Sequence, residues 1–183
     1  MILASASPQR RAILEQLGIA FEVVVPDVEE LVAGPPHELA IENAYRKAAA
    51  VAQAHPDARV LGVDTIVAVY SQIYGKPADR DGAAATLAAL AGRSHKVISG
   101  VCVIEDGRHR TAAATTSVRF RALDQRLLDW YLDSEEWRGR AGGYAIQGRG
   151  AALVTAIEGD YLNVVGLPVV TLLELAGDLL PPV

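Results

Sequence analysis

The chain has 183 residues, 21% of them charged, and a net charge of −5. The length predicts a single domain over 1–183 with its own core, and the acidic balance argues against general nucleic-acid binding, which needs a basic surface. The single Cys102 excludes an intrachain disulfide and a cysteine-based zinc site. No apolar run is long enough for a membrane span, and the arginines follow the first apolar residues, so no signal peptide is expected. We therefore expect a cytoplasmic protein without a membrane or nucleic-acid partner.

Strand and helix patterns alternate in the first half of the sequence. A short apolar strand, Met1–Ala4, precedes a helix that Ser7 caps, Pro8 opens and Gly18 ends. The other elements predicted here are strands at Phe21–Val25 and Val60–Val63, a loop at Pro26–Pro36, a helix at His37–His55, and an extended segment at Ile66–Tyr70.

The second half predicts more strands and hairpins than helices. Asp79 caps an alanine-rich helix that ends near Gly92, and Asp124 caps a helix over Gln125–Leu132. The other elements predicted here are strands at Lys96–Ile104 and Thr115–Arg121, the turn Asp106-Gly107 after the first of them, a loop at Gly139–Gly150, a hairpin formed by Ala151–Ile157 and Tyr161–Val165, and a last helix from about Val169 to Leu180. This order of elements predicts an α/β fold with a mixed sheet.

The segment from Ser5 to Arg11 has the composition of a phosphate site. A strand that runs into a helix start presents free backbone N–H groups and the positive end of the helix dipole. Hydroxyl groups and two guanidinium groups add to these donors. The alternative, a helix cap followed by solvated arginines, stays open.

Carboxylates and lysines provide the other polar groups. Asp64 follows an apolar strand, where a carboxylate is costly unless it is paired or binds a metal ion. If folding brings the acidic loop with Glu30 close to Asp64, the two carboxylates can hold magnesium. Lys47 on a helix and Lys76 in a proline turn add positive charge, unless they are ordinary surface lysines. Together these groups suit phosphoryl chemistry, and no Walker-type loop is present.

Six segments of the sequence, taken in order, resemble the Maf family. They are Leu3–Arg11, Gly62–Thr65, Gly75–Pro77, Leu90–His95, Gly143–Gly148 and Val165–Pro168. The resemblance implies an elongated mixed sheet flanked by helices, related to the inosine triphosphate pyrophosphatases, and a homodimer as a common assembly. It also implies an enzyme that hydrolyses a nucleoside triphosphate between the α- and β-phosphates with Mg²⁺, or Mn²⁺ as an alternative.

The same resemblance assigns roles to individual residues. Asp64 matches the catalytic aspartate, as a metal ligand or as the base that activates water, and Glu30 matches a second metal position. The positions that match phosphate-binding residues are Ser7, Arg10, Lys47 and Lys76.

Three positions bear on the choice of nucleobase. Thr65 and Gln147 resemble the family type that acts on dTTP and UTP, because an amide both donates to and accepts from a pyrimidine edge. The type that acts on 7-methyl-GTP has a carboxylate where Gln147 stands. Gln9 departs from the pyrimidine type, which usually has arginine there, so 7-methyl-GTP stays open as a substrate. A non-enzymatic nucleotide-binding regulator of septum formation also stays open.

Overall fold

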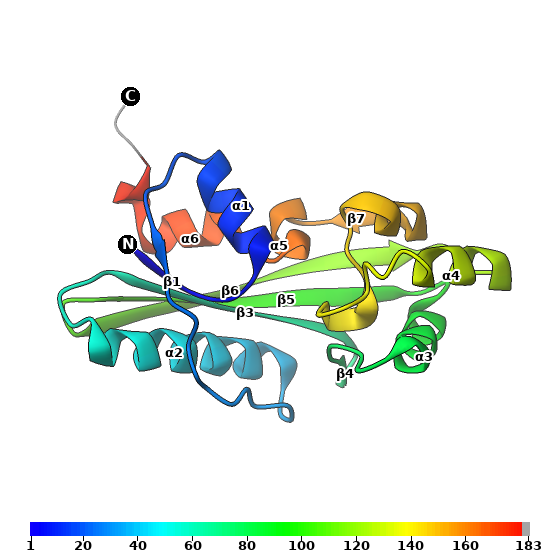
Figure 1. The fold of residues 1–183 in the computed structure, drawn as a ribbon, viewed down its shortest axis with the longest axis horizontal. Helices are drawn as coiled ribbons and strands as arrows, with labels where there is room; N and C mark the ends of the chain where they lie inside the picture. Colours follow the sequence, from blue (N-terminus) through cyan, green and yellow to red (C-terminus); the bar gives the residue numbers. More distant parts are fainter. Residues whose placement is uncertain (181–183) are drawn as a thin grey trace. The chain divides into compact units, whose positions relative to one another are not determined.

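The computed structural model describes residues 1–180 and contains one mixed sheet. Seven strands make up the sheet, in the order β2-β1-β3-β5-β6-β7, with β4 beside β3 (Figure 1). The pairs β1–β2 and β1–β3 are parallel, whereas β3–β4 and β6–β7 are antiparallel. The predicted α/β class with a mixed sheet is therefore confirmed.

The chain divides into two compact units. The first unit comprises Met1–Thr65, Ser99–Ala114 and the chain from Gly166 onward, and the second comprises Ile66–Ile98 and Thr115–Val165. Three long strands contribute residues to both units: β3 (Val60–Val69), β5 (Ser94–Glu105) and β6 (Arg108–Phe120).

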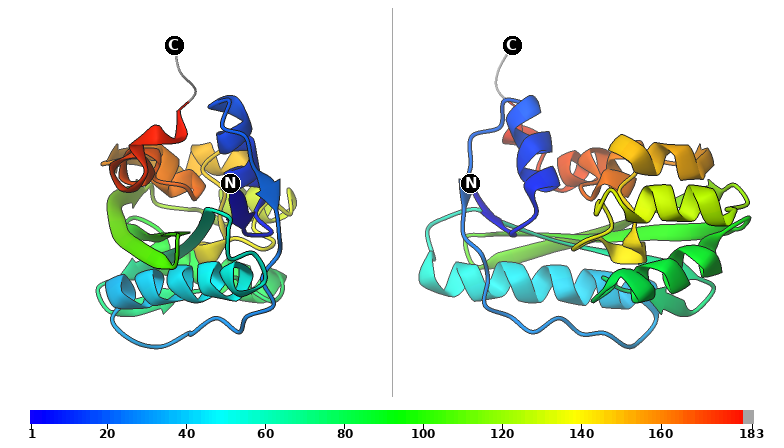
Figure 2. Two further views of the ribbon diagram at one scale, coloured as in Figure 1. Left: turned by 90° about the vertical axis from the view of Figure 1, so that its left-hand side faces the viewer. Right: turned by 45° about the vertical axis from the view of Figure 1, so that its right-hand side comes forward.

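In the first unit, helices cover both faces of the strands. Helix α2 lies against one face, and α1 and α6 lie on the opposite face (Figures 1 and 2). The elements that lie wholly in this unit are β1 (Ile2–Ala4), α1 (Pro8–Gln16), β2 (Glu22–Val23), α2 (Pro36–Ala54), α6 (Val169–Leu175) and a 3₁₀ turn at Gly177–Leu179.

Helix α2 packs on the sheet through alanine and glycine. Its residues Ala40, Ala44 and Ala48 are fully buried. A Cβ atom added to Gly62 of β3 would lie 2.8 Å from the Ala48 nitrogen, and one added to Gly100 of β5 would lie 2.6 Å from the Ile41 nitrogen. Both distances are shorter than any ordinary contact of a Cβ atom, so the helix backbone rests directly on the strands.

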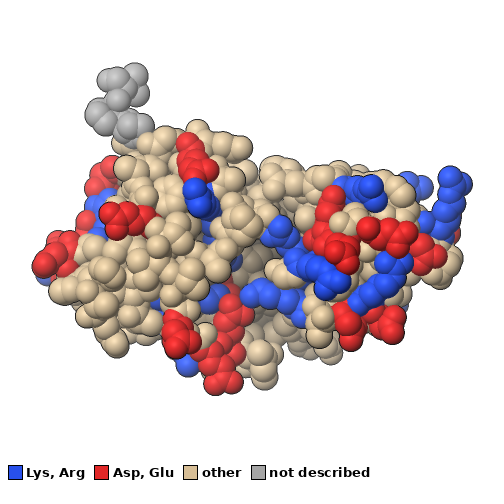
Figure 3. Space-filling model, viewed as in Figure 1, with Lys and Arg blue, Asp and Glu red and all other residues tan. Residues whose placement is uncertain are grey.

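The second unit has a core of larger side chains. Its largest buried side chains include Leu87, Phe120, Tyr131 and Trp137. The elements that lie wholly in this unit are β4 (Gln72–Tyr74), α3 (Arg80–Leu90), α4 (Gln125–Leu132), 3₁₀ turns at Ala141–Gly143 and Gly148–Leu153, β7 (Val154–Glu158) and α5 (Tyr161–Val165). On the face in Figure 3, basic and acidic side chains lie interleaved over this unit.

Part of the secondary structure predicted for residues 139–165 is wrong. The predicted hairpin is absent, because β7 pairs with β6, with Val118 opposite Ile157, and Tyr161–Val165 forms helix α5. The Asp160 carboxylate accepts a hydrogen bond from the Leu162 N–H at 2.7 Å and so starts this helix. The segment predicted as a loop contains the 3₁₀ turn Ala141–Gly143 and the start of the 3₁₀ turn Gly148–Leu153.

Other boundaries also differ from the prediction. Strand β3 continues through Asp64 to Val69 instead of ending at Val63, and β6 begins at Arg108. The strand predicted over Phe21–Val25 is only Glu22–Val23. The last helix ends at Leu175 and is followed by a 3₁₀ turn. Among residues 1–180, no helix is both long and apolar enough to cross a membrane.

Candidate active site

Asp64 lies inside strand β3 rather than at its end. Strand β1 pairs with β3 as far as Gly62, and β4 pairs with it from Val67 onward. Asp64 and Thr65 therefore lie between the stretches that these two strands cover. Asp64 is 6% exposed, so its carboxylate needs partners within the protein.

Lys47 supplies the main partner of this carboxylate. Its Nζ lies 2.6 Å from Asp64 Oδ1 and 2.6 Å from Glu30 Oε1. The Lys47 and Asp64 side chains are 10% and 8% exposed, and the Glu30 side chain is 36% exposed. One ammonium group thus holds two carboxylates that come from the acidic loop and from β3. The structure thus brings Glu30 close to Asp64, which is the condition for the magnesium site considered from the sequence.

Asn43 lies one helical turn before Lys47 and faces the same group of atoms. It is 3% exposed, and its Oδ1 accepts a hydrogen bond from the Leu31 N–H at 2.8 Å. Its Nδ2 donates to the Leu31 carbonyl at 3.0 Å and to Asp64 Oδ2 at 3.3 Å. Asn43 was not among the site residues predicted from the sequence, although residues four apart on a helix share one face.

The guanidinium group of Arg10 is held by protein acceptors. Nε donates to the Gly166 carbonyl at 2.9 Å, Nη1 to Ser5 Oγ at 2.9 Å, and Nη2 to Thr65 Oγ1 at 3.0 Å. The Thr65 hydroxyl also lies 2.9 Å from the hydroxyl of Ser99, which is fully buried. Arg10 therefore orients the residue next to Asp64. Ser5 belongs to the segment predicted to bind phosphate, whereas nothing in the sequence pointed to Ser99.

Burial and nearby charges act on Arg10 in opposite directions. Burial lowers the pKa of Arg10, while the negative charges of Asp64 and Glu30 act to raise it. A guanidinium group nevertheless keeps its charge in proteins. The first unit thus brings two cations and two carboxylates close together.

Ser7 and Gln9 lie at the start of helix α1. The Ser7 Oγ accepts a long hydrogen bond from the Arg10 N–H at 3.5 Å and donates to Gln9 Oε1 at 3.3 Å. The Ser7 N–H donates to Ser5 Oγ at 3.2 Å. The predicted cap is present, and both side chains are half-buried.

Lys76 and Gln147, the other two predicted site residues, belong to the second unit. Lys76 is exposed in the segment after β4, and Gln147 is exposed at the start of the 3₁₀ turn Gly148–Leu153. The Glu136 carboxylate fixes that turn, because it accepts hydrogen bonds from the N–H groups of Arg149 at 3.0 Å and Gly150 at 3.2 Å.

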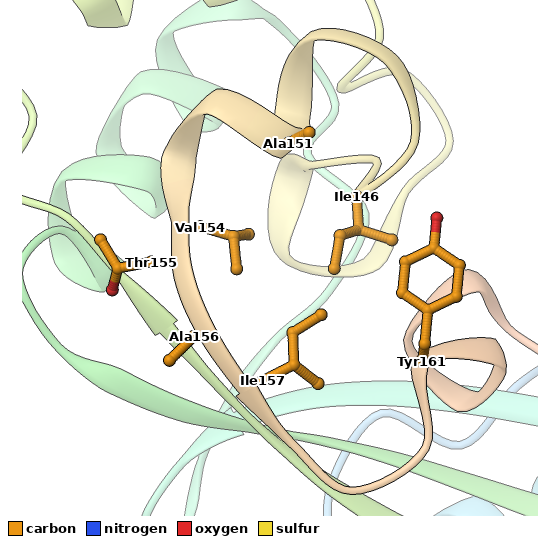
Figure 4. A pocket seen from close by; sticks show the side chains of 7 residues that line it. All are labelled: Ile146, Ala151, Val154, Thr155, Ala156, Ile157 and Tyr161. Atoms are coloured by element: carbon orange, nitrogen blue, oxygen red, sulfur yellow. The ribbon is translucent and has the colours of Figure 1, made fainter.

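The second unit also has a pocket of about 350 Å³ along β7 (Figure 4). Its lining residues are Ile146, Ala151, Val154, Thr155, Ala156, Ile157 and Tyr161. None of these side chains is charged, so the pocket lacks the cations that a triphosphate requires.

The two carboxylates fit a divalent cation as partial ligands. Their oxygens converge on one point, where Lys47 Nζ stands, and hard cations prefer such oxygen donors. Among residues 1–180, no group of three or more His, Cys, Asp or Glu residues is arranged to hold a metal ion. Mg²⁺ commonly takes only one or two carboxylates and completes its coordination with phosphate oxygens and water.

Comparison with known proteins gives the family. The family described as Maf-like protein matches residues 1–179. The chain belongs to the Maf family. Three Maf relatives, each named dTTP/UTP pyrophosphatase, match nearly the whole chain. The protein from Symbiobacterium thermophilum is 48% identical over 92% of this chain and 88% of its own length. The proteins from Pyrococcus furiosus and Deinococcus radiodurans are 41% and 44% identical, each over 96% of this chain and over 93% and 90% of their own lengths.

The resemblance to the Maf family found in the sequence motifs is therefore confirmed. Membership of this family suggests a divalent metal cofactor, for which Glu30 and Asp64 offer oxygen ligands.

Proposed function

We propose that the chain hydrolyses a nucleoside triphosphate between its α- and β-phosphates, with dTTP and UTP preferred and Mg²⁺ as the cofactor. The relatives named dTTP/UTP pyrophosphatase support this substrate class. The observation that carries the proposal is the buried Lys47 ammonium between Asp64 and Glu30. A carboxylate pair compensated by a single lysine suits a site that receives a cation and a polyphosphate together.

In the proposed reaction, a water oxygen attacks the α-phosphorus, and the bond from that phosphorus to the bridging oxygen breaks. The products are the nucleoside monophosphate and pyrophosphate. Asp64 accepts the proton of the attacking water or holds the cation, and Glu30 is the second ligand. A bound divalent cation supplies positive charge to the phosphate oxygens.

The cations of the chain have separate tasks in this proposal. Lys47 transfers its hydrogen bonds from the carboxylates to a phosphate oxygen when the substrate enters, and Lys76 compensates the charge of the leaving pyrophosphate. Ser7 contacts phosphate at the start of α1. Arg10 acts by holding Ser5 and Thr65, because its Nε, Nη1 and Nη2 each donate to a protein acceptor.

Thr65 and Gln147 select the pyrimidine base in this proposal. Gln147 is exposed and carries an amide, which satisfies both the donor and the acceptors of a uracil edge. A homodimer and a cytoplasmic location also belong to the proposal. Size-exclusion chromatography with light scattering tests the homodimer.

The deciding experiment measures pyrophosphate release from dTTP, UTP and 7-methyl-GTP with Mg²⁺, with Mn²⁺ and with EDTA. We expect pyrophosphate and monophosphate from dTTP and UTP with either metal ion, and none with EDTA. The Asp64→Asn variant should lose at least about 10²-fold in rate, the scale of general-base catalysis. The matched control is Asp57→Asn, which neutralises an exposed aspartate of the same unit.

Release of orthophosphate instead of pyrophosphate would refute the proposed bond cleavage. An Asp64→Asn variant that keeps more than about a tenth of the wild-type rate would remove Asp64 from its role. A preference for 7-methyl-GTP would refute the base assignment alone.

A further inference from the structure

Asn43 joins two parts of the candidate active site that are distant in sequence. It lies on the buried face of α2 and bonds both backbone groups of Leu31, at 2.8 Å and 3.0 Å. The second hydrogen of its amide nitrogen points to Asp64 Oδ2, 3.3 Å away. One side chain therefore contacts the acidic loop and the strand that carries Asp64.

The acidic loop, residues 26–35, depends on such polar contacts for its position. None of its residues is buried, so apolar packing contributes little to holding it. Asn43 holds Leu31, and Lys47, one turn farther along α2, holds the adjacent Glu30. Two neighbouring loop residues are thus fastened by two side chains on one face of the helix.

The amide of Asn43 suits this task better than any charged or apolar side chain. The Leu31 N–H is paired with an acceptor, its carbonyl with a donor, and the Asp64 carboxylate with a further donor. An amide provides one acceptor oxygen and two N–H donors. Aspartate in the same place would lose both donors, and leucine would lose all three hydrogen bonds.

We infer that Asn43 is a positioning residue that fixes the Glu30 carboxylate relative to the Asp64 carboxylate. Its amide acts through these two groups and contacts no phosphate. The catalytic consequence rests on the proposed function, in which both carboxylates serve one cation. The structural consequence, a loop fastened by Asn43, does not depend on that function.

The test compares the wild type with Asn43→Leu and Asn43→Asp, and uses Gln53→Leu as the matched control. Gln53 is exposed on the same helix, so the control also replaces a side-chain amide with leucine but at an exposed position. Hydrogen–deuterium exchange reports on residues 26–35, titration with Mn²⁺ followed by electron paramagnetic resonance reports on cation binding, and steady-state kinetics with UTP at varied Mg²⁺ gives kcat and KM.

We expect Asn43→Leu to speed exchange in residues 26–35 and to weaken Mn²⁺ binding. It should raise the Mg²⁺ concentration for half-maximal rate by about 10–100-fold, the usual effect of removing a group that orients metal ligands. The KM for UTP at saturating Mg²⁺ should change little. Asn43→Asp keeps the acceptor for the Leu31 N–H, so its loop exchange should be intermediate. Gln53→Leu should behave as the wild type.

The inference is overturned if Asn43→Leu and Asn43→Asp exchange loop hydrogens and bind Mn²⁺ as the wild type does, even if their melting temperatures fall. A wild type that releases pyrophosphate from no triphosphate would instead refute the proposed function. In that case the exchange and Mn²⁺ measurements still decide the role of Asn43.

Discussion

Replacing Lys47 with methionine tests whether its ammonium group compensates the two carboxylates. Methionine keeps an unbranched side chain but carries no charge. In the structure, Lys47 Nζ lies 2.6 Å from an oxygen of Asp64, whose side chain is 8% exposed. The substitution therefore leaves a buried carboxylate without its cation, while Glu30, with a side chain 36% exposed, regains water.

The expected loss can be worked out from these two environments. Removing one member of a buried ion pair costs about 3–5 kcal/mol of unfolding free energy. The lower end applies here, because Asp64 keeps the hydrogen bond from Asn43 and Glu30 is partly solvated. A loss of about 3 kcal/mol corresponds to a fall in Tm of about 6–12 °C for a chain of this size.

The assay is urea denaturation followed by far-ultraviolet circular dichroism. The matched control is Lys96→Met, since Lys96 is exposed. The double variant Lys47→Met with Asp64→Asn should regain part of the lost stability, because it also removes the stranded charge. The reasoning is refuted if Lys47→Met unfolds at the same urea concentration as the wild type, or if Lys96→Met loses as much stability.

Three further predictions concern other parts of the chain. Gln147→Glu should lower kcat/KM for dTTP and UTP by about 10–100-fold, because a carboxylate only accepts hydrogen bonds and would face carbonyl oxygens. If the kcat/KM values for dTTP, UTP and 7-methyl-GTP keep their wild-type order, the prediction is wrong. Gly100→Ala should destabilise the first unit by about 3 kcal/mol, because its Cβ would lie 2.6 Å from the Ile41 nitrogen. A Cβ atom at Gly75 would have nothing within 4 Å, so Gly75→Ala should keep the wild-type stability in the same urea assay. Burial lowers the pKa of His95 from 6.5 to about 4, so the unfolded chain binds the proton first as pH falls. The buried neutral His95 therefore leaves the free energy of unfolding undiminished above pH ~6.5 and lowers it as the pH falls from ~6.5 to ~4. Between pH 7.5 and pH 5 this loss of unfolding free energy is about 2 kcal/mol. In the urea assay at pH 7.5 and pH 5, His95→Phe should lack this part of the pH dependence of stability. An equal loss of stability in the variant and the wild type would contradict the prediction.

Local hydrogen bonds explain which helix starts could be predicted. The carboxylates of Asp79 and Asp124 each accept a hydrogen bond at 2.8 Å from an N–H three residues later, so the residues that identify these helices are close in sequence. The Asp160 carboxylate makes a similar bond to Leu162, but the apolar residues after it were interpreted as a strand. The partner of β7 could not be predicted locally, because β6 lies about forty residues away in sequence.

The charged residues of the candidate site could be predicted from the sequence, but the contacts between them could not. The buried position of Asp64 after an apolar strand indicated that it needed a partner. That the partner is Lys47, 17 residues earlier, follows only from the packing of α2 on β3. Ser99 carries a small polar side chain in an apolar stretch of sequence, and such residues are common in satisfied cores. Its sequence context therefore gave no separate signal, and the role of Asn43 depends on contacts with Leu31 and Asp64 that only the fold brings about.

The alanine and glycine contact between α2 and the strands has a consequence for how the candidate site tolerates change. Where backbones are in direct contact, no side chain can change its rotamer to make room. The distance between α2 and β3 is therefore fixed. Lys47 and Asn43 project from this same helix toward Asp64. Any larger residue at Ala44 or Ala48 must lift the helix as a whole and draw the ammonium and the amide away from Asp64 together. Because hydrogen bonds weaken within a few tenths of an ångström, we expect the proposed turnover to be lost at displacements that the rest of the fold still accommodates.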